Sequence, residues 1–224
     1  MTITIFGATG GIGSQAVIYA LEKGFVVKAY VRNPKKLGIK HSNLSVIVGE
    51  LNEYSKMRDA IKGCDAVVCC IGIPMQFYYT NKVSFEAHKR ILSIMKEEKI
   101  TRLIDWATPS ASSPQDKLSP LTLFPKILAS IFLPIAKSEI VKIAELIVKS
   151  DLDWTIVRFI APTNDQIDNE PDVSFGNKPL SFKIARASIA KFMIDELENN
   201  NYIHSMPIIG RKLQIKNRPM NFVC

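Results

Sequence analysis

A glycine-rich turn near the amino terminus is the segment of this sequence with the clearest chemical meaning. It lies directly after an apolar run, Thr2–Phe6, and before a stretch with helical periodicity. Its candidate binding residues are Gly7, Thr9, Gly10, Gly11, Ile12 and Gly13. Glycines permit positive φ and let backbone N–H groups approach a phosphate, and the start of a helix attracts anions. The order of strand, turn and helix therefore predicts a dinucleotide site, and the alternative is a structural turn that binds no nucleotide.

A basic turn follows the second apolar run, Val26–Val31, and bears on which dinucleotide would bind. Sites that prefer NAD place an acid here for the ribose 2′-hydroxyl, whereas a 2′-phosphate requires a cation. The sequence has no acid at this point and instead has Arg32, followed by Lys35 and Lys36. A guanidinium suits a phosphate well. The turn therefore predicts NADP(H) as cofactor, unless these charges form only a solvated loop.

Apolar runs alternate with helical patterns along the whole chain and must position these residues. The expected strands are Thr2–Phe6, Val26–Val31, Leu44–Val48, Ala66–Cys70, Arg102–Ala107 and Trp154–Arg158. The expected helices are Gly11–Lys23, Tyr54–Ile61, Asn81–Glu98, Lys137–Lys149 and Ser188–Glu198. Nearly continuous hydrophobicity in the strands indicates a parallel sheet buried on both faces. The chain is therefore predicted to form one α/β domain over residues 1–224, with a doubly wound parallel sheet.

One segment, at about residues 109–136, interrupts this alternation. This segment contains five prolines, and residues 121–133 contain eight large apolar side chains. So many apolar side chains are not expected to remain in solvent. We expect residues 121–133 to cover the nicotinamide end of the cofactor or to form an interface with another subunit or a partner protein.

Composition narrows the remaining classes of function. The chain has 224 residues, of which 47% are hydrophobic, 22% charged and 8% aromatic. No run is long and apolar enough for a membrane span, and the amino terminus does not resemble a signal peptide, so a cytoplasmic protein that does not bind membranes is expected. Neither the four cysteines nor the three histidines have metal-ligand spacing, and no metal site is expected. The net charge of +8 favours anionic partners, but without a binding motif no direct nucleic-acid binding is expected.

Further motifs extend the pattern of the glycine turn along the chain. They are Val31-Arg32-Asn33-Pro34, Gly49-Glu50-Leu51, Gly63-Cys64-Asp65-Ala66-Val67-Val68, Ile71-Gly72 and Asp153-Trp154-Thr155-Ile156-Val157-Arg158. Together they resemble the atypical short-chain dehydrogenases/reductases, a group with an NAD(P)-binding Rossmann fold, and within it the biliverdin reductase B (flavin reductase)-like and NmrA-like proteins. The resemblance implies that Glu50 and Leu51 border the adenine and that Gly72 passes close to the ribose on the nicotinamide side. Glu50 could equally be an ordinary solvated carboxylate.

The catalytic acid of ketone-reducing relatives is missing at its expected place. These relatives use a Tyr-x-x-x-Lys pair, in which the tyrosine protonates the carbonyl oxygen. Tyr19 and Tyr78 each precede a lysine at this spacing, but neither lies on the helix before the sixth strand. Thr108 matches the position of the family's catalytic serine, and it could orient a substrate or the carboxamide of the cofactor. It could equally be a plain threonine at a strand end.

Loss of this acid leaves two functional hypotheses. Flavins, quinones and tetrapyrroles accept hydride at conjugated centres and can take protons from water, so the resemblance implies an NADPH-dependent reductase of a planar acceptor. Lys137 and Lys142 could attract an anionic acceptor, and Phe77, Tyr78 and Tyr79 could stack on a flat ring, although solvated lysines and ordinary aromatic packing are the alternatives. The second hypothesis is a non-catalytic NADP(H)-sensing regulator of the NmrA-like kind.

Overall fold

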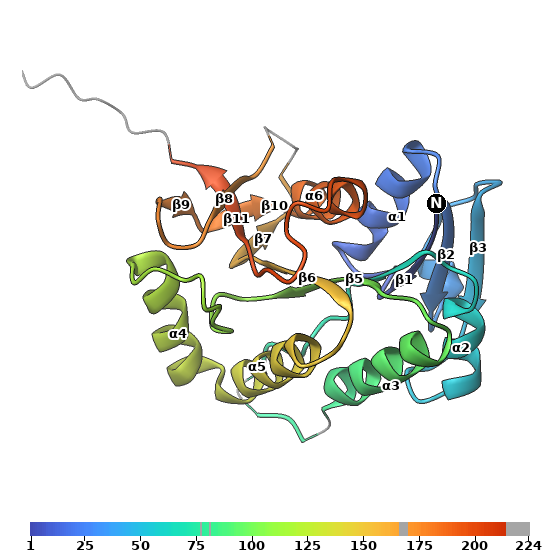
Figure 1. The fold of residues 1–224 in the computed structure, drawn as a ribbon, viewed down its shortest axis with the longest axis horizontal. Helices are drawn as coiled ribbons and strands as arrows, with labels where there is room; N and C mark the ends of the chain where they lie inside the picture. Colours follow the sequence, from blue (N-terminus) through green and yellow to red (C-terminus); the bar gives the residue numbers. More distant parts are fainter. Residues whose placement is uncertain (77, 81, 166–169, 214–224) are drawn as a thin grey trace, which may run out of the picture.

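A central sheet with helices on both faces forms the framework of the molecule (Figure 1). The computed structural model describes residues 1–76, 78–80, 82–165 and 170–213. The main sheet has the strand order β3-β2-β1-β4-β5-β6-β11-β8, with β9 paired to β11, while β7 and β10 form a separate pair. The strands are β1 (Thr2–Phe6), β2 (Val26–Val31), β3 (Leu44–Val48), β4 (Ala66–Cys69), β5 (Arg102–Ala107), β6 (Asp153–Arg158), β7 (Ala161–Thr163), β8 (Asp172–Ser174), β9 (Leu180–Ser181), β10 (Lys183–Ala185) and β11 (Ile208–Lys212).

The helices divide between the two faces of the sheet. Helices α1 (Gly13–Glu22) and α6 (Arg186–Asn199) lie on one face, and α2 (Tyr54–Ile61), α3 (Val83–Glu97) and α5 (Pro134–Val148) lie on the other (Figure 1). A short 3₁₀ helix, Pro34–Lys36, follows β2. Alternate side chains of each central strand face opposite layers, so Val68 packs towards α1 and α6 while Val67 packs towards α2 and α3. This explains the continuous apolar runs of the central strands.

The sequence prediction of the first six strands is confirmed, and the sheet is the expected α/β doubly wound Rossmann arrangement with β1 at the centre. All five helices that the sequence predicted are present. The helix Tyr54–Ile61 has the predicted bounds, and the end points of the other four differ by one to three residues. The strands β7 to β11 were not predicted. The strands β7 to β10 have only two or three residues each and lie in a polar region with little alternation, and β11 has only two large apolar residues, Ile208 and Ile209. Two of them, β8 and β9, run antiparallel to β11.

The segment after β5 contains a regular helix, α4 (Pro120–Phe132), with Pro125 inside it. Ser119 and Thr122 form a capping box that fixes the start of this helix. Its buried residues, Leu121, Thr122 and Pro125, attach it to the body of the molecule, and Leu121 packs with Leu180 and Ile208. Its outer face is apolar and exposed, and Ile131 and Phe132 are 58% and 61% accessible.

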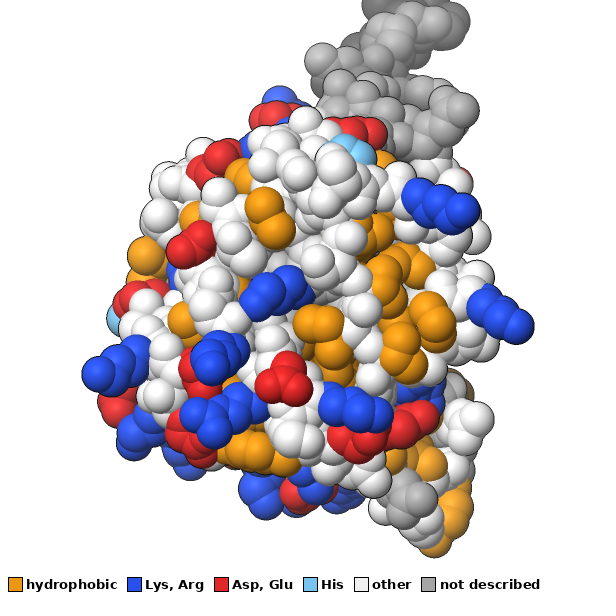
Figure 2. Space-filling model, turned by 90° about the vertical axis from the view of Figure 1, so that its right-hand side faces the viewer, with side chains coloured by type: hydrophobic (Ala, Val, Ile, Leu, Met, Phe, Trp, Pro, Cys, Tyr) orange, Lys and Arg blue, Asp and Glu red, His pale blue; other side chains and the backbone are white. Residues whose placement is uncertain are grey.

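The face shown in Figure 2 has no continuous patch of basic side chains, although the net charge of the chain is +8. On this face lysines and arginines stand among aspartates and glutamates, and hydrophobic side chains gather near one edge of the view. Within the described residues, no helix has both the length and the hydropathy needed to cross a membrane.

Candidate cofactor cleft

The glycine turn connects β1 to α1 at the carboxyl edge of the sheet. Gly7 has φ +72°, and a side chain there would collide with the carbonyl of Cys70 at the end of β4. A side chain on Gly13 would collide with the carbonyl of Gly7. Both glycines are therefore required by the close approach of the turn, the helix and the neighbouring strand. This packing holds the turn open towards the edge of the sheet.

A first cavity of about 490 Å³ runs from the turn towards β2 and β3. Its lining includes Arg32 and Lys36 from the basic turn and Leu51 from the loop after β3. Asn33 accepts a hydrogen bond from the backbone N–H of Lys35 at 3.0 Å and so fixes the start of the 3₁₀ helix that holds Lys36. Two cations therefore lie at the place where a 2′-phosphate would require them. We refer to this cavity as the adenosine half of the cleft.

A second cavity, of about 310 Å³, begins at the same turn and runs towards β5 and β6. Its walls are largely apolar, with Trp106 and Phe159 stacked at 5.6 Å between ring centroids. Both cavities are lined by Gly10, Cys70 and Gly72, so they form one continuous cleft across the glycine turn. We call the second cavity the nicotinamide half. A cleft at this switch point, between β1 and β4, is where open α/β sheets bind dinucleotides.

The residues predicted from the sequence lie around this cleft as follows. Gly7, Thr9, Gly10, Arg32, Leu51 and Gly72 line the adenosine half, and Gly10, Gly11, Ile12, Gly72 and Thr108 line the nicotinamide half. Gly13 lies behind the turn as the first residue of α1. Glu50 lies next to Leu51 but does not line either half, and its side chain is exposed. Lys137 and Lys142 do not line the cleft either, and Lys137 donates to Ser130 at 2.6 Å. Phe77 is outside the described residues.

Thr108, directly after β5, is the residue with a hydroxyl group among the described residues that line the nicotinamide half. Its Oγ1 lies 2.5 Å from Oγ of Ser110, and each of these hydroxyls could be the donor. No tyrosine, histidine or lysine lines this half among the described residues. The site can therefore orient a polar group, but it offers no obvious proton donor of its own.

The helix before β6, where ketone-reducing relatives have their Tyr–Lys pair, carries a buried glutamate here. Glu139 on α5 accepts a hydrogen bond from Tyr79 at 2.6 Å and another from the backbone N–H of Phe85 at 2.9 Å. Burial, together with the carboxylate of Glu139, raises the pKa of Tyr79. Tyr79 is therefore a structural contact and a poor acid. Tyr19 donates to Asp195 on α6, and Tyr78 is 72% exposed, so neither of them contributes an acid to the cleft.

Arg158, at the end of β6, holds the segment that follows Thr108. Its side chain is fully buried and donates to both carboxylate oxygens of Asp116, at 2.6 and 2.8 Å. It also donates to the carbonyls of Ala111 and Met206. The sequence showed only the position of this arginine, and the structure shows that it stabilises the loop that follows Thr108. Phe159, Ile160 and Pro162, which follow Arg158, form part of the apolar lining of the nicotinamide half.

A buried polar cluster beneath the sheet was missed by the sequence analysis. Cys69, His88 and Asp105 come from β4, α3 and β5, and their potential ligand atoms lie within 4.8 Å of one another. Nδ1 of His88 donates to the carbonyl of Ser84 at 2.6 Å, while its Nε2 lies 2.9 Å from Asp105 and 3.1 Å from Cys69. The set has the residue types of a metal site, but residues 19 and 17 apart in sequence give no local motif. In the described structure it connects α3 to the centre of the sheet.

Burial also determines the state of the cysteines. Burial raises the pKa of the Cys69 thiol, and burial together with Cys69 and Asp105 raises that of the Cys70 thiol well above its usual range. Although Cys70 lines the cleft, a protonated thiol is a weak nucleophile. This agrees with its interpretation as a strand-end residue.

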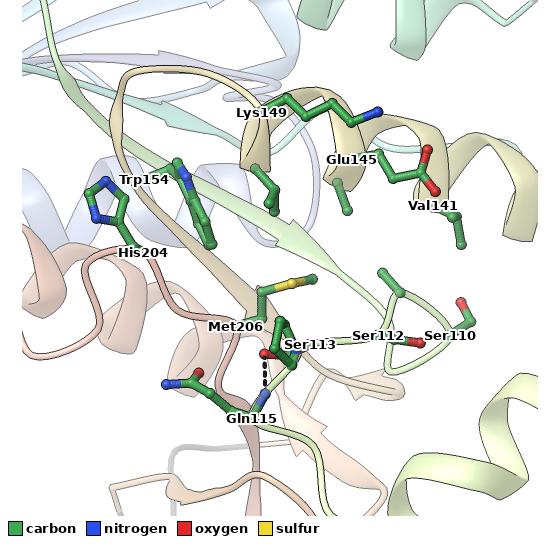
Figure 3. Close-up of a pocket in the computed structure, with 14 residues that line it drawn as sticks. Ser110, Ser112, Ser113, Gln115, Val141, Glu145, Lys149, Trp154, His204 and Met206 are labelled. Carbon is green, nitrogen blue, oxygen red and sulfur yellow. Dashed lines mark hydrogen bonds between the residues drawn. The ribbon is translucent and has the colours of Figure 1, made fainter.

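A separate cavity of about 580 Å³ lies between α5 and the loop after Thr108 (Figure 3). Trp154 and His204 approach each other on one side, with ring centroids 5.6 Å apart, while Glu145 lies on α5 and Lys149 directly follows this helix. Residues 110–115, which we call the serine loop, close the opposite side, where the backbone N–H of Gln115 donates to Ser113 at 3.3 Å. No glycine of the turn lines this cavity, so it is distinct from the candidate cofactor cleft.

Comparison with known protein families supports the interpretation of this cleft as a dinucleotide site. The model of the NAD(P)H-binding family matches residues 7–200, which include the glycine turn and both halves of the cleft. The chain belongs to the NAD(P)H-binding family. Among proteins of known sequence, "Uncharacterized protein YwnB" of Bacillus subtilis (strain 168) is 28% identical over 211 residues, which cover 89% of this chain and 93% of that protein.

Other similarities are shorter or concern the fold of this NAD(P)H-binding protein. The dihydroflavonol 4-reductase of Callistephus chinensis is 35% identical over 85 residues, 34% of this chain. The matches cover 22% to 36% of the length of the dihydroflavonol 4-reductases. A short-chain dehydrogenase/reductase from Veillonella parvula, solved in complex with NADP, has a TM-score of 0.73 at 18% identity, with 94% of each chain covered. At this identity the structural likeness establishes the shared fold.

Proposed function

We propose that this protein is an NADPH-dependent reductase that transfers hydride to a planar acceptor, such as a flavin, a quinone or a tetrapyrrole-like compound. The observation that carries this proposal is the composition of the nicotinamide half. Flat apolar walls, one threonine hydroxyl and the guanidinium of Arg186 surround it, and its described lining has no tyrosine, histidine or carboxylate. Such a site suits an acceptor that needs no enzymatic acid at the moment of hydride transfer.

Each part of the cleft has a separate role in this proposal. The backbone of the glycine turn would hold the pyrophosphate, and Arg32 with Lys36 would bind the 2′-phosphate. NADPH supplies the hydride when it is bound. Thr108 would orient the acceptor or the carboxamide, while Trp106 and Phe159 would exclude water and contact a flat ring. The acceptor's proton would come from solvent.

Resemblance to the biliverdin reductase B (flavin reductase)-like proteins supports this choice of acceptor. Its motifs surround the cleft at the turn, after β2, after β3 and after β4. The resemblance alone does not separate reductases from cofactor sensors, because proteins that share a fold can differ in activity.

The direct test is NADPH oxidation, followed by absorbance, with a panel of flavins, quinones and tetrapyrroles and with simple ketones and secondary alcohols as controls. We expect turnover with at least one planar acceptor and negligible activity on ketones, since general acid catalysis typically contributes about 10²- to 10⁴-fold. Brisk ketone reduction that Tyr78→Phe abolishes would mean that the loop after β4 supplies a proton, and the proposal would then be wrong.

The second candidate is an NADP(H)-sensing regulator of the NmrA-like kind. The observation that favours it is the apolar outer face of α4, which is exposed in the single chain and could contact a partner. If NADPH binds firmly but no acceptor is reduced, this candidate replaces the first. Its own test is retention of a partner protein on the immobilised chain in only one cofactor state.

A further inference from the structure

Arg186, which was not among the residues singled out in the sequence, reaches the glycine turn from the opposite side of the cleft. It is the first residue of α6, directly after β10. The aliphatic part of its side chain lies over Gly11, because a Cβ placed on Gly11 would come within 2.7 Å of Cδ and 2.8 Å of Nε of Arg186. The side chain also lines the nicotinamide half together with Gly10 and Gly11. The turn and the arginine thus face the same space.

The guanidinium of Arg186 is only partly used by the protein. Its Nη1 donates to Oδ1 of Asn164 at 2.6 Å. Within the described part of the chain, its other two nitrogens have no protein partner, and no carboxylate is paired with it. It is also the one charged side chain among the described residues that line the nicotinamide half. A planar cation with unused donors beside a glycine turn suits a phosphate group.

We propose that Arg186 binds the pyrophosphate of the dinucleotide, so that the anion is held between the backbone of the turn and this guanidinium. The inference rests on the proposed cofactor site. It gives Gly11 a specific role, since the missing side chain leaves room for the arm of Arg186. The apolar stem then covers the turn while the charged end remains free to bind.

This role differs from that of Arg32 in a measurable way. Arg32 lies in the adenosine half, where it would bind the 2′-phosphate that NADPH has and NADH lacks. The pyrophosphate is common to both dinucleotides. Loss of Arg186 should therefore weaken the binding of NADPH and of NADH by the same factor, whereas loss of Arg32 should weaken the binding of NADPH alone.

The experiment measures the dissociation constants of NADPH, NADH and adenosine 2′-monophosphate for the unmutated protein, Arg186→Ala and Arg186→Lys. One charged contact corresponds to about 10- to 150-fold in affinity. We expect Arg186→Ala to weaken the affinity for both dinucleotides by this factor. Its affinity for adenosine 2′-monophosphate should be unchanged, because this nucleotide has no pyrophosphate. The dissociation constants of Arg186→Lys should lie between those of the unmutated protein and Arg186→Ala, because lysine keeps the positive charge but lacks the planar guanidinium. Lys183→Ala, an exposed lysine on β10, is the matched control and should change nothing.

A double-mutant cycle tests the contact with Gly11. Gly11→Ala alone should weaken dinucleotide binding, because the added Cβ displaces the arm of Arg186. In the Arg186→Ala background the same substitution should have little further effect, since the two residues act through one contact. Purely additive losses would contradict the proposed arrangement.

Two results would overturn the inference while the proposed cofactor site stands. In one, Arg186→Ala leaves both dissociation constants unchanged; in the other, it raises only the KM for the acceptor, which would make Arg186 an acceptor-binding residue. If the unmutated protein binds neither dinucleotide, the cofactor site itself is wrong and the role of Arg186 is lost with it. A circular dichroism spectrum of each variant verifies that it is folded.

Discussion

Arg32 is the residue on which cofactor preference depends. It lines the adenosine half with Lys36, and no acidic residue lines that half among the described residues. Arg32→Ala should weaken NADPH by about 10- to 150-fold and leave NADH nearly unchanged, because one charged phosphate contact is lost. Calorimetric titration of both dinucleotides measures this. Equal affinity for NADH and NADPH in the unmutated protein would show that Arg32 does not read the 2′-phosphate.

Thr108 is the residue whose role in turnover is most specific. Its hydroxyl faces the nicotinamide half and contacts Ser110. Thr108→Val keeps the shape of the side chain and removes the hydrogen bond, so kcat with a planar acceptor should fall while the dissociation constant of NADPH stays nearly the same. Steady-state kinetics and titration separate the two quantities. Ser110→Ala tests the partner hydroxyl, and an unchanged kcat in Thr108→Val would leave Thr108 as an ordinary strand-end residue.

The cysteines near the cleft should be unreactive in the folded protein. Because burial raises the pKa of the Cys69 and Cys70 thiols, the thiolate fraction is small near neutral pH and increases only as the pH rises towards the elevated pKa. We expect slow alkylation of both at neutral pH and faster alkylation at alkaline pH. Peptide mass spectrometry locates the label and separates it from Cys224, which lies outside the described residues. Rapid labelling of Cys70 at neutral pH would instead indicate a reactive thiol.

At the scale of elements, α4 is the helix whose environment in the single chain is incomplete. Six of its apolar side chains, Leu123, Phe124, Ile127, Leu128, Ile131 and Phe132, are 38% to 61% exposed. None of its residues lines the described cleft, so of the two predicted roles of residues 121–133, cover over the nicotinamide is not seen here. An interface with another copy or a partner stays the prediction.

Limited proteolysis tests this prediction about α4. Cleavage within residues 121–133 should become slower as the protein concentration increases, because association would cover the helix. Cleavage in an exposed loop such as residues 38–43 is a suitable control and should not depend on concentration. Rapid cutting within α4 that responds neither to concentration nor to NADPH would contradict both predicted roles.

Prediction from sequence succeeded where a pattern was local. The strands β1 to β6 and the glycine turn are continuous segments with strong periodicity or glycine spacing, and their positions follow from the chain itself. Arg186, the Tyr79–Glu139 bond and the Cys69–His88–Asp105 cluster were not predicted, because each depends on contacts between distant segments. Gly11 offered one signal in the sequence. It is a second glycine directly after Gly10, and a residue without a side chain can indicate that another group packs closely against the backbone there.

At the scale of the whole molecule, the candidate cleft and a second cavity lie apart in the part of the chain that the structure describes. The candidate cleft crosses the carboxyl edge of the sheet, and the other cavity lies between α5 and the serine loop (Figure 3). Thr108 lines one, Ser110 lines the other, and the two hydroxyls are in contact. Both proposed functions require NADPH to bind in the candidate cofactor cleft.

Hydrogen–deuterium exchange of the protein with and without NADPH therefore tests the central claim most directly. Binding should slow the exchange of backbone amides in the segments that line the cleft. These are residues 7–13, 30–36, 70–75, 83–84, 106–108 and 159–162, together with Leu51 and Arg186. Amides near Trp154 and His204, and those of α4 in protein held at constant concentration, should be unaffected. The account predicts protection confined to the segments that line the cleft. Protection centred on the Trp154 and His204 cavity, or no protection at all at saturating NADPH, would contradict it.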